Sequence, residues 1–334
     1  MPFIILGGLM EGLFTLPVKI TPKWSWENIW GAGSLCALIL VPGPLLLITV
    51  PHFQNVYAAA PSAAILWAIL FGAGWGLGGI FFGLGVSALG LSLGTSLIMG
   101  LVAIGGSVVP LLLQHRDQLF GKSGAALLSG IGIMILGLAL CARAGSLKTA
   151  TGASSKTGSF SPAFSLGLFY CIAAGLLSAL VNFALIFGAP IANPAIAQGL
   201  DAATANNAVW ALVFAANYLV NLGYCFYLGF RKQTLVKFFL PGTGSYWILA
   251  MVMGLLWAGG IVVYGRGASM EGIYGPVFGF PIMLIASILT GNFTGAILAE
   301  WRGAPARAKR TMQWSVAIMI VAIVTLGCSN YWIP

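Results

Sequence analysis

The sequence has few charged residues, and acids are the scarcest among them. Only 6% of its 334 residues are charged, with six Asp and Glu against 15 Lys and Arg. A soluble domain carries about 25% charged residues, so this composition excludes a soluble protein. The first apolar stretch also lacks the basic start and the small-residue cleavage site of a signal peptide. We therefore expect that stretch to remain as a membrane span.

The residues that most enzymes use are also few. The two histidines, His52 and His115, fall in predicted loops, and no Ser-His-Asp set can be assembled around them. The five cysteines stand singly in apolar stretches, without the spacing of a metal site or a disulfide. The glycine motifs lie inside apolar runs and lack the Lys-Ser/Thr of a phosphate-binding loop. We expect no enzyme activity, no metal and no cofactor other than protons as a coupling ion.

Long apolar runs are what the sequence has in abundance, since 59% of its residues are hydrophobic. Most runs reach the roughly 20 residues that a spanning helix needs, and they lack the alternation of strands. The pattern predicts an all-α membrane protein with ten transmembrane helices. These lie at about 3–19, 28–50, 63–88, 91–113, 123–142, 162–188, 202–229, 245–264, 273–299 and 312–333.

Lys and Arg are distributed unevenly over the predicted loops. Twelve of the 15 fall on one side of the membrane, and the other three, Arg116, Lys122 and Arg266, fall on the opposite side. Basic loops stay in the cytoplasm, so both termini are predicted to be periplasmic in a bacterial inner membrane. The net charge of +9 therefore reflects topology and does not indicate a nucleic acid partner. We expect the chain to be surrounded by lipid and to need no obligatory protein partner.

The chain divides into two similar halves. We predict an N-terminal five-helix repeat at 1–143, a cytoplasmic linker at 144–161 and a C-terminal five-helix repeat at 162–334. The glycine-rich segment 83–90 matches 265–272 at a constant offset, and Trp75 parallels Trp257. Five spans per half would invert one repeat relative to the other. Such repeats predict alternating access around a site near the membrane midplane.

Glu11 is the one acid near the middle of an apolar stretch. At about 1.5 Å per residue, Lys19 lies roughly 12 Å along the helix, too far to pair with it. An ionised carboxylate at this depth is costly unless it faces water, finds a partner or takes a proton. We predict that Glu11 carries the coupling proton; the alternative is a permanently protonated acid. The other acids, which we expect in structural roles at helix ends or beside basic residues, are Glu27, Asp117, Asp201, Glu271 and Glu300.

Several stretches spread along the chain carry a family resemblance. They are LPVK at 16–19, KWSWE at 23–27, FGAGWG at 71–76, RAGSLK at 143–148, NFALIFG at 182–188, NLGYCF at 221–226 and EW at 300–301. In this order they resemble the rhamnose–proton symporter family of the drug/metabolite transporter superfamily. The resemblance covers nearly the whole chain. It implies ten helices in two inverted repeats and proton-driven uptake of a 6-deoxyhexose.

A neutral sugar requires hydrogen-bonding groups and an aromatic wall, with few charges. The midspan candidates for this site are Thr15, Trp75, Asn182, Asn217, Asn221, Trp257 and Asn292. We expect Trp75 and Trp257 to hold the sugar ring between them, and Thr15 to share a helix face with Glu11. The alternatives are an interhelical hydrogen bond for each Asn and plain packing for each Trp. Tyr264 and Tyr274 are predicted gates, and the tryptophans expected at the membrane interface are Trp24, Trp26, Trp30, Trp301 and Trp332.

The sequence thus predicts a secondary transporter that imports L-rhamnose or a similar 6-deoxyhexose with protons. Two alternatives remain open at this point. One is a transporter of the same superfamily with another substrate, such as an exported metabolite. The other is a membrane sensor that binds a sugar without moving it.

Overall fold

The computed structural model describes all residues except 90, 115–120, 150–161, 273–274, 300 and 330–334. The described part of the chain is helical and contains no β-strand. Its first half contains α1 (Pro2–Leu13), α2 (Leu16–Lys19), α3 (Trp26–Leu35), η1 (Cys36–Leu40), α4 (Pro42–Thr49), α5 (Phe53–Ala59), α6 (Ser62–Leu89), α7 (Leu91–Ala103), η2 (Ile104–Val108), α8 (Val109–Gln114) and α10 (Lys122–Thr149). Its second half contains α11 (Pro162–Ser178), α12 (Leu180–Gly188), η3 (Ala189–Ile191), α13 (Asn193–Ala197), α14 (Ala202–Ala205), α15 (Asn207–Arg231), η4 (Leu235–Phe239), α16 (Gly244–Met270), α17 (Gly275–Ile297) and α18 (Ala306–Ser329).

Eight helical segments of the described chain are long and apolar enough to cross a bilayer. They are Trp26–Thr49, Ser62–Leu89, Gly124–Lys148, Phe164–Ile191, Ala202–Arg231, Gly244–Met270, Gly275–Ile297 and Ala306–Cys328. Two shorter apolar helices, Pro2–Val18 and Leu97–Val108, lie where the first and fourth spans were predicted. The protein is therefore a multi-pass helical membrane protein. The count of ten spans and the inverted repeat stay predictions.

Two spans contain a π-helical segment shortly before a proline. Each segment ends two residues before a proline, η1 before Pro42 and η2 before Pro110. Proline has no backbone N–H and interrupts the regular hydrogen-bond ladder, and a wider turn accommodates this locally. These segments leave backbone carbonyls free for partners outside their own helix, as is seen at Gly106 below.

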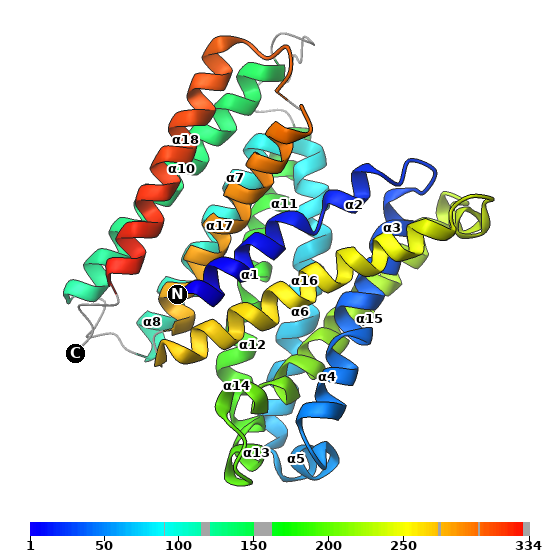
Figure 1. Ribbon diagram of the computed structural model, residues 1–334, viewed down its shortest axis with the longest axis vertical. Coiled ribbons are helices and arrows are strands. Elements are labelled where there is room, and N and C mark those ends of the chain that lie inside the picture. Colours follow the sequence, from blue (N-terminus) through cyan, green and yellow to red (C-terminus); the bar gives the residue numbers. More distant parts are fainter. Residues whose placement is uncertain (90, 115–120, 150–161, 273–274, 300, 330–334) are drawn as a thin grey trace.

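Helix α1 packs closely between α16 and α17 because it presents glycines to both. A Cβ built on Gly7 would lie 2.6 Å from the carbonyl oxygen of Gly260 on α16. One built on Gly8 would lie 2.5 Å from the Cβ of Ala286 on α17, and Gly12 is equally close to Thr290. In lipid, helices associate by close packing rather than by a hydrophobic drive, and small residues allow it. Figure 1 shows α1 running between α17 and α16.

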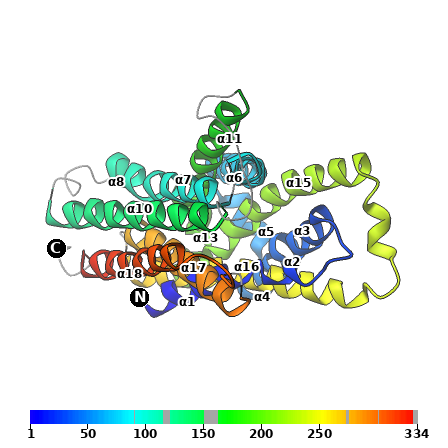
Figure 2. The same cartoon turned by 90° about the horizontal axis from the view of Figure 1, so that it is seen from above.

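Helices α10 and α18 form a pair at one edge of the molecule, side by side in both views (Figures 1 and 2). Ser315 on α18 is fully buried, and its hydroxyl donates to the carbonyl oxygen of Gly137 on α10 at 2.7 Å. Helix α10 continues to Thr149, so residues 144–149 of the predicted linker are helical. The rest of that linker lies outside the described residues.

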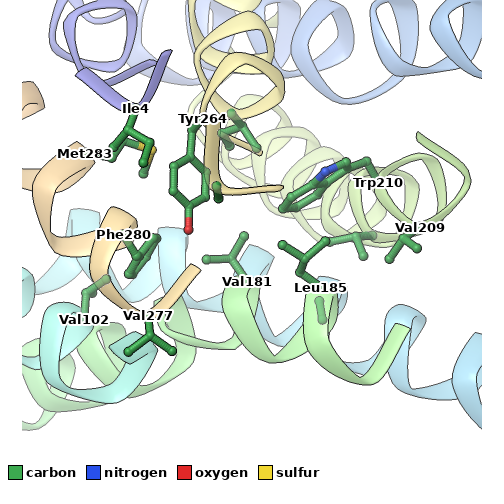
Figure 3. Packing of buried hydrophobic residues seen from close by; sticks show 14 of the residues in the cluster. Ile4, Val102, Val181, Leu185, Val209, Trp210, Tyr264, Val277, Phe280 and Met283 are labelled. Atoms are coloured by element: carbon green, nitrogen blue, oxygen red, sulfur yellow. The ribbon is translucent and has the colours of Figure 1, made fainter. Parts of the chain in front are cut away.

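The largest buried cluster lies around Tyr264, the bulkiest fully buried side chain. Its ring extends from α16 and contacts Phe280 of α17 at a centroid distance of 6.0 Å. Figure 3 shows the hydroxyl pointing toward the space between Phe280 and Val181. The cluster therefore joins α16, α17 and α12 around one phenol group.

Candidate functional site

Four aromatic rings from four different helical regions meet beside α1; we call Phe14, Trp30, Trp75 and Trp257 the aromatic box. Phe14, at the end of α1, stacks on Trp257 of α16 with centroids 5.7 Å apart. Trp30 of α3 lies 5.5 Å from Trp257, and Trp75 of α6 meets Trp257 edge-on at 6.1 Å. Trp257 is thus the common member, contacted by all three other rings.

Two buried amides line the adjoining face of α15. Asn217 and Asn221 are four residues apart and therefore share one face of the helix. The Asn221 amide donates to the side-chain oxygen of Asn217 at 2.6 Å, and the indole N–H of Trp30 donates to the Asn221 oxygen at 2.8 Å. This chain of hydrogen bonds connects the aromatic box to a polar strip, so rings and amides form one site.

Glu11 lies one helical turn before Phe14, at the tight contact between α1 and α16. Its Cγ would be 3.2 Å from a Cβ added at Gly260, and Gly260 is one turn from Trp257 on the same helix. Its Oε1 is buried and has no hydrogen-bond partner in the described chain. Helix α17, on the other side of α1, contains no charged residue. An uncompensated carboxylate charge here would be costly, so the position suits a group that binds and releases a proton.

A second polar network closes around Tyr264, about two turns further along α16 from Trp257. The Tyr264 hydroxyl donates to the side-chain oxygen of Asn182 at 3.4 Å. The Asn182 amide donates in turn to the carbonyl oxygen of Gly106 in η2 and, at 3.4 Å, to that of Pro276. The network joins η2 of the first half to α12, α16 and α17 of the second. The neighbouring Ser107 hydroxyl is buried without a partner in the described chain.

The structure does not bring every predicted site residue together. Thr15 follows the end of α1 and is exposed, and Asn292 lies beside Cys141 of α10 instead of at the aromatic box. Trp75 and Trp257 contact each other edge to face, so the gap expected between them for a sugar ring is closed in this conformation. The predicted gate Tyr274 lies outside the described residues.

Sequence reasoning missed two members of the box. Trp30 was expected at the membrane interface because it lies near the start of its span, yet its ring and its N–H both face the site. Phe14 was not considered. A usable signal existed for Phe14, because it lies three residues after Glu11 and hence on the same side of α1.

The family model described as L-rhamnose-proton symport protein (RhaT) matches residues 3–330. The chain belongs to the L-rhamnose-proton symporter family. Relatives named L-rhamnose-proton symporter occur in Shigella dysenteriae serotype 1 (strain Sd197) and Escherichia coli (strain 55989 / EAEC). Each is 28% identical over 337 residues, which cover 98% of this chain and 96% of the relative. These relatives are named as transporters, not as enzymes.

The other described acids of this symporter-family chain all have partners. Glu27 accepts from the Thr234 hydroxyl at 2.6 Å and pairs with Lys232 at 3.4 Å. Asp201 caps α14, and hydrogen bonds from the Thr204 hydroxyl and backbone N–H lower the pKa of its carboxyl group. Glu271 pairs with the amino group of Met1. Within the described residues no group of three or more His, Cys, Asp or Glu is placed to hold a metal.

Proposed function

We propose that this protein is a proton-coupled symporter that imports L-rhamnose or a similar 6-deoxyhexose. Membership of the L-rhamnose-proton symporter family supports the substrate and the coupling ion. Ten spans in two inverted halves, with periplasmic termini in a bacterial inner membrane, fit the charge pattern and the positions of the two shorter helices. The sugar site of this proposal is the aromatic box together with Asn217 and Asn221.

The chemistry of this site suits a deoxy sugar. Such a sugar has an apolar face with a methyl group, and the rings of Trp257 and Phe14 offer a flat apolar wall for it. Its hydroxyl groups both donate and accept hydrogen bonds, as do the amides of Asn217 and Asn221. A sugar that displaced the hydrogen bond between these two amides would leave neither of them unpaired. None of the side chains of Phe14, Trp257, Asn217 and Asn221 carries a charge, which fits a neutral ligand.

Glu11 supplies the proton step of the proposal. When protonated, the side chain is neutral and tolerates its buried position; when ionised, it requires water or a partner. Movement of α1 away from α16 would admit water to the carboxyl group and would also part Phe14 from Trp257. Proton release and opening of the sugar site would then be one event. Alternating access follows if the Tyr264 network closes one side while the other side opens.

The observation that carries the proposal is the buried, unpartnered carboxyl oxygen of Glu11 one turn from the aromatic box. Of the acids that the structure describes, it alone has this environment, since Glu27, Asp201 and Glu271 have partners. A proton carrier must be able to change its charge during transport, and an acid already held by a cation or by cap bonds is poorly suited to that.

The test is uptake of labelled L-rhamnose into proteoliposomes with an imposed proton gradient. Glu11→Gln should abolish gradient-driven accumulation while retaining counterflow exchange of the sugar, because exchange needs no net proton movement. Glu11→Asp, which keeps a carboxyl group at the same position, serves as the matched control and should still accumulate sugar along the gradient. Accumulation by Glu11→Gln equal to wild type would show that the proton binds elsewhere, and a wild-type protein that moves no rhamnose in either assay would refute the function itself.

A further inference from the structure

A polar cavity lies at the predicted outer end of the bundle, away from the aromatic box. Its volume is about 140 Å³, and it lies between α4, α12, α14, α15 and α16. Its polar lining consists of Thr49, Thr204, Asn206, Asn207, Trp210, Arg266 and Ser269. A single water needs only about 10–15 Å³ of such space, so this cavity has room for a small polar solute. Trp210 and Leu185, which both line it, are drawn in Figure 3.

The lining offers donors and acceptors together. The Asn207 amide donates to the Thr49 hydroxyl at 2.8 Å, which leaves the Asn207 oxygen as an acceptor. The Ser269 hydroxyl donates to the carbonyl oxygen of Gly265 at 2.9 Å, so its own lone pairs are also left to accept. The indole nitrogen of Trp210, which can only donate, lies at the cavity wall beside Gly265. Hydroxyl groups, which donate and accept at once, match this mixture.

Charge at the cavity also favours a neutral ligand. Arg266 is the cationic side chain in the lining of the cavity, and its charge acts on the nearby carboxyl group of Asp201. Hydrogen bonds from Thr204, and to a smaller extent the charge of Arg266, lower the pKa of the Asp201 carboxyl group, which is therefore ionised at neutral pH. Charges of both signs therefore stand near the cavity, because Arg266 lines it and Asp201 lies two residues before the lining residue Ala203. A binding site for an anion would instead present donors and positive charge without a nearby acid.

One face of α15 connects this cavity to the aromatic box. Trp210, Phe214, Asn217 and Asn221 recur at intervals of three or four residues and are all buried, from 0% to 4% exposed. Trp210 stacks on Phe214 with centroids 5.4 Å apart and an interplanar angle of 28°. The same face of α15 therefore has Trp210, whose ring lines the cavity, at one end and the two amides of the proposed sugar site at the other.

The ring contacts continue without a break from α15 to the box. Phe214 lies 5.9 Å from Trp75, and Trp75 lies 6.1 Å from Trp257, each within the 4.5–7 Å range of paired aromatic rings. Aromatic faces bind the C–H groups of a sugar without fixing its hydroxyls, so a series of rings lets a sugar move in small steps. Packing alone would require only that these rings be apolar, whereas the polar cavity at the end of the series points to a ligand.

We propose that the cavity at Trp210 is an outer subsite for a neutral monosaccharide, and that the rings from Trp210 to Trp257 form the path by which the sugar reaches the central site. This inference rests on the proposed transport function, because it assigns an additional place to the same substrate. The sugar first binds with its hydroxyls on Asn207, Ser269 and Arg266. It then passes along Phe214 and Trp75 when α15 and α16 part from α6.

Filling the cavity tests the proposal. Ser269→Phe places a ring in the cavity without altering the aromatic box, while Ser87→Phe adds the same ring to an exposed position at the end of α6. In proteoliposomes, Ser269→Phe should raise the KM for L-rhamnose uptake at least tenfold and leave the maximal rate within about twofold. Ser87→Phe should match the wild type. An unchanged KM in a folded Ser269→Phe protein would overturn the proposal.

A second measurement covers the case in which Ser269→Phe does not fold. Ser269→Cys is made in a background with Cys328→Ser and Cys141→Ala, which removes the exposed and the half-buried native cysteines and leaves three buried ones. Residue 269 then provides the accessible thiol for a maleimide reagent. L-Rhamnose should slow its labelling at least fivefold, and should still do so when Asn221→Ala weakens the central site. Labelling that rhamnose leaves unchanged would refute the outer subsite. Normal rhamnose uptake by the wild type alongside that result would leave the proposed function intact, whereas no uptake at all would refute both.

Discussion

Replacing Gly7 by Ala should loosen the contact that holds Glu11 in place. The new Cβ would lie 2.6 Å from the carbonyl oxygen of Gly260, and 3.0 Å from the backbone nitrogen of Tyr264. Ordinary contact begins near 3.4 Å, so α1 and α16 must separate by about 0.8 Å. A gap of that size forfeits roughly a quarter to a half of the dispersion energy of each atom pair across it. Neither obstacle is a side-chain tip that could rotate away.

The expected cost can be estimated and checked. Overpacking typically costs about 1–3 kcal/mol, and replacing a helical glycine by Ala returns about 0.5–1 kcal/mol. Gly7→Ala should therefore lose roughly 0.5–2 kcal/mol, measured as a lower Tm by thermal unfolding in detergent. Gly259→Ala is the matched control, because its Cβ meets only the flexible end of Met10, and it should be as stable as the wild type or more so. A Gly7→Ala protein as stable as Gly259→Ala would refute the packing argument.

Two further substitutions test single hydrogen-bonding groups. Trp30→Phe keeps a ring in the aromatic box but leaves the Asn221 oxygen without its donor, so stability measured by thermal unfolding should fall by about 1–3 kcal/mol, against no such loss for the exposed Trp26→Phe. Asp201→Ala removes the N-cap of α14 and should lower the free energy of unfolding by about 1 kcal/mol, whereas Asp201→Asn should largely retain this stabilisation. Because Thr204 lowers the pKa of Asp201, that stabilisation is present above about pH 4 and is lost as the pH falls through the lowered value, which a Tm series from pH 6 to pH 3 would measure.

The spans could be predicted from the sequence because apolar length is a local property. The eight long spans agree with the predicted segments to within a few residues, apart from longer extensions at some ends. The first apolar helix, Pro2–Val18, has nearly the predicted bounds, but it is interrupted: α1 ends at Leu13, and the chain turns at Phe14 and Thr15 before α2 begins. That turn also places Thr15 outside the helix that contains Glu11, and this is a detail that helical periodicity alone does not reveal.

The site could be predicted only in part, because its members come from distant segments. Asn217 and Asn221 could be named from their polar side chains in an apolar span, and Trp257 from its depth. Trp30 could not, since a tryptophan near a span end has the same sequence pattern whether it faces lipid or the bundle. Only the tertiary contact with Asn221 distinguishes the two cases. The same limit applies to Asn182, whose partner in η2 is 76 residues away along the chain.

The glycines of α1 offer a physical basis for coupling between the proposed proton site and the proposed sugar site. Gly7 and Gly260 bring two helix backbones so close that Glu11 is sealed between them, and Phe14 and Trp257 are stacked one turn further along the same interface. In the proposed mechanism, movement of α1 away from α16 opens both places together. Water would then reach the carboxyl group as the stacked pair separates. Larger residues at Gly7 and Gly260 would hold the two helices apart. Water access to Glu11 would then no longer depend on separation of Phe14 from Trp257.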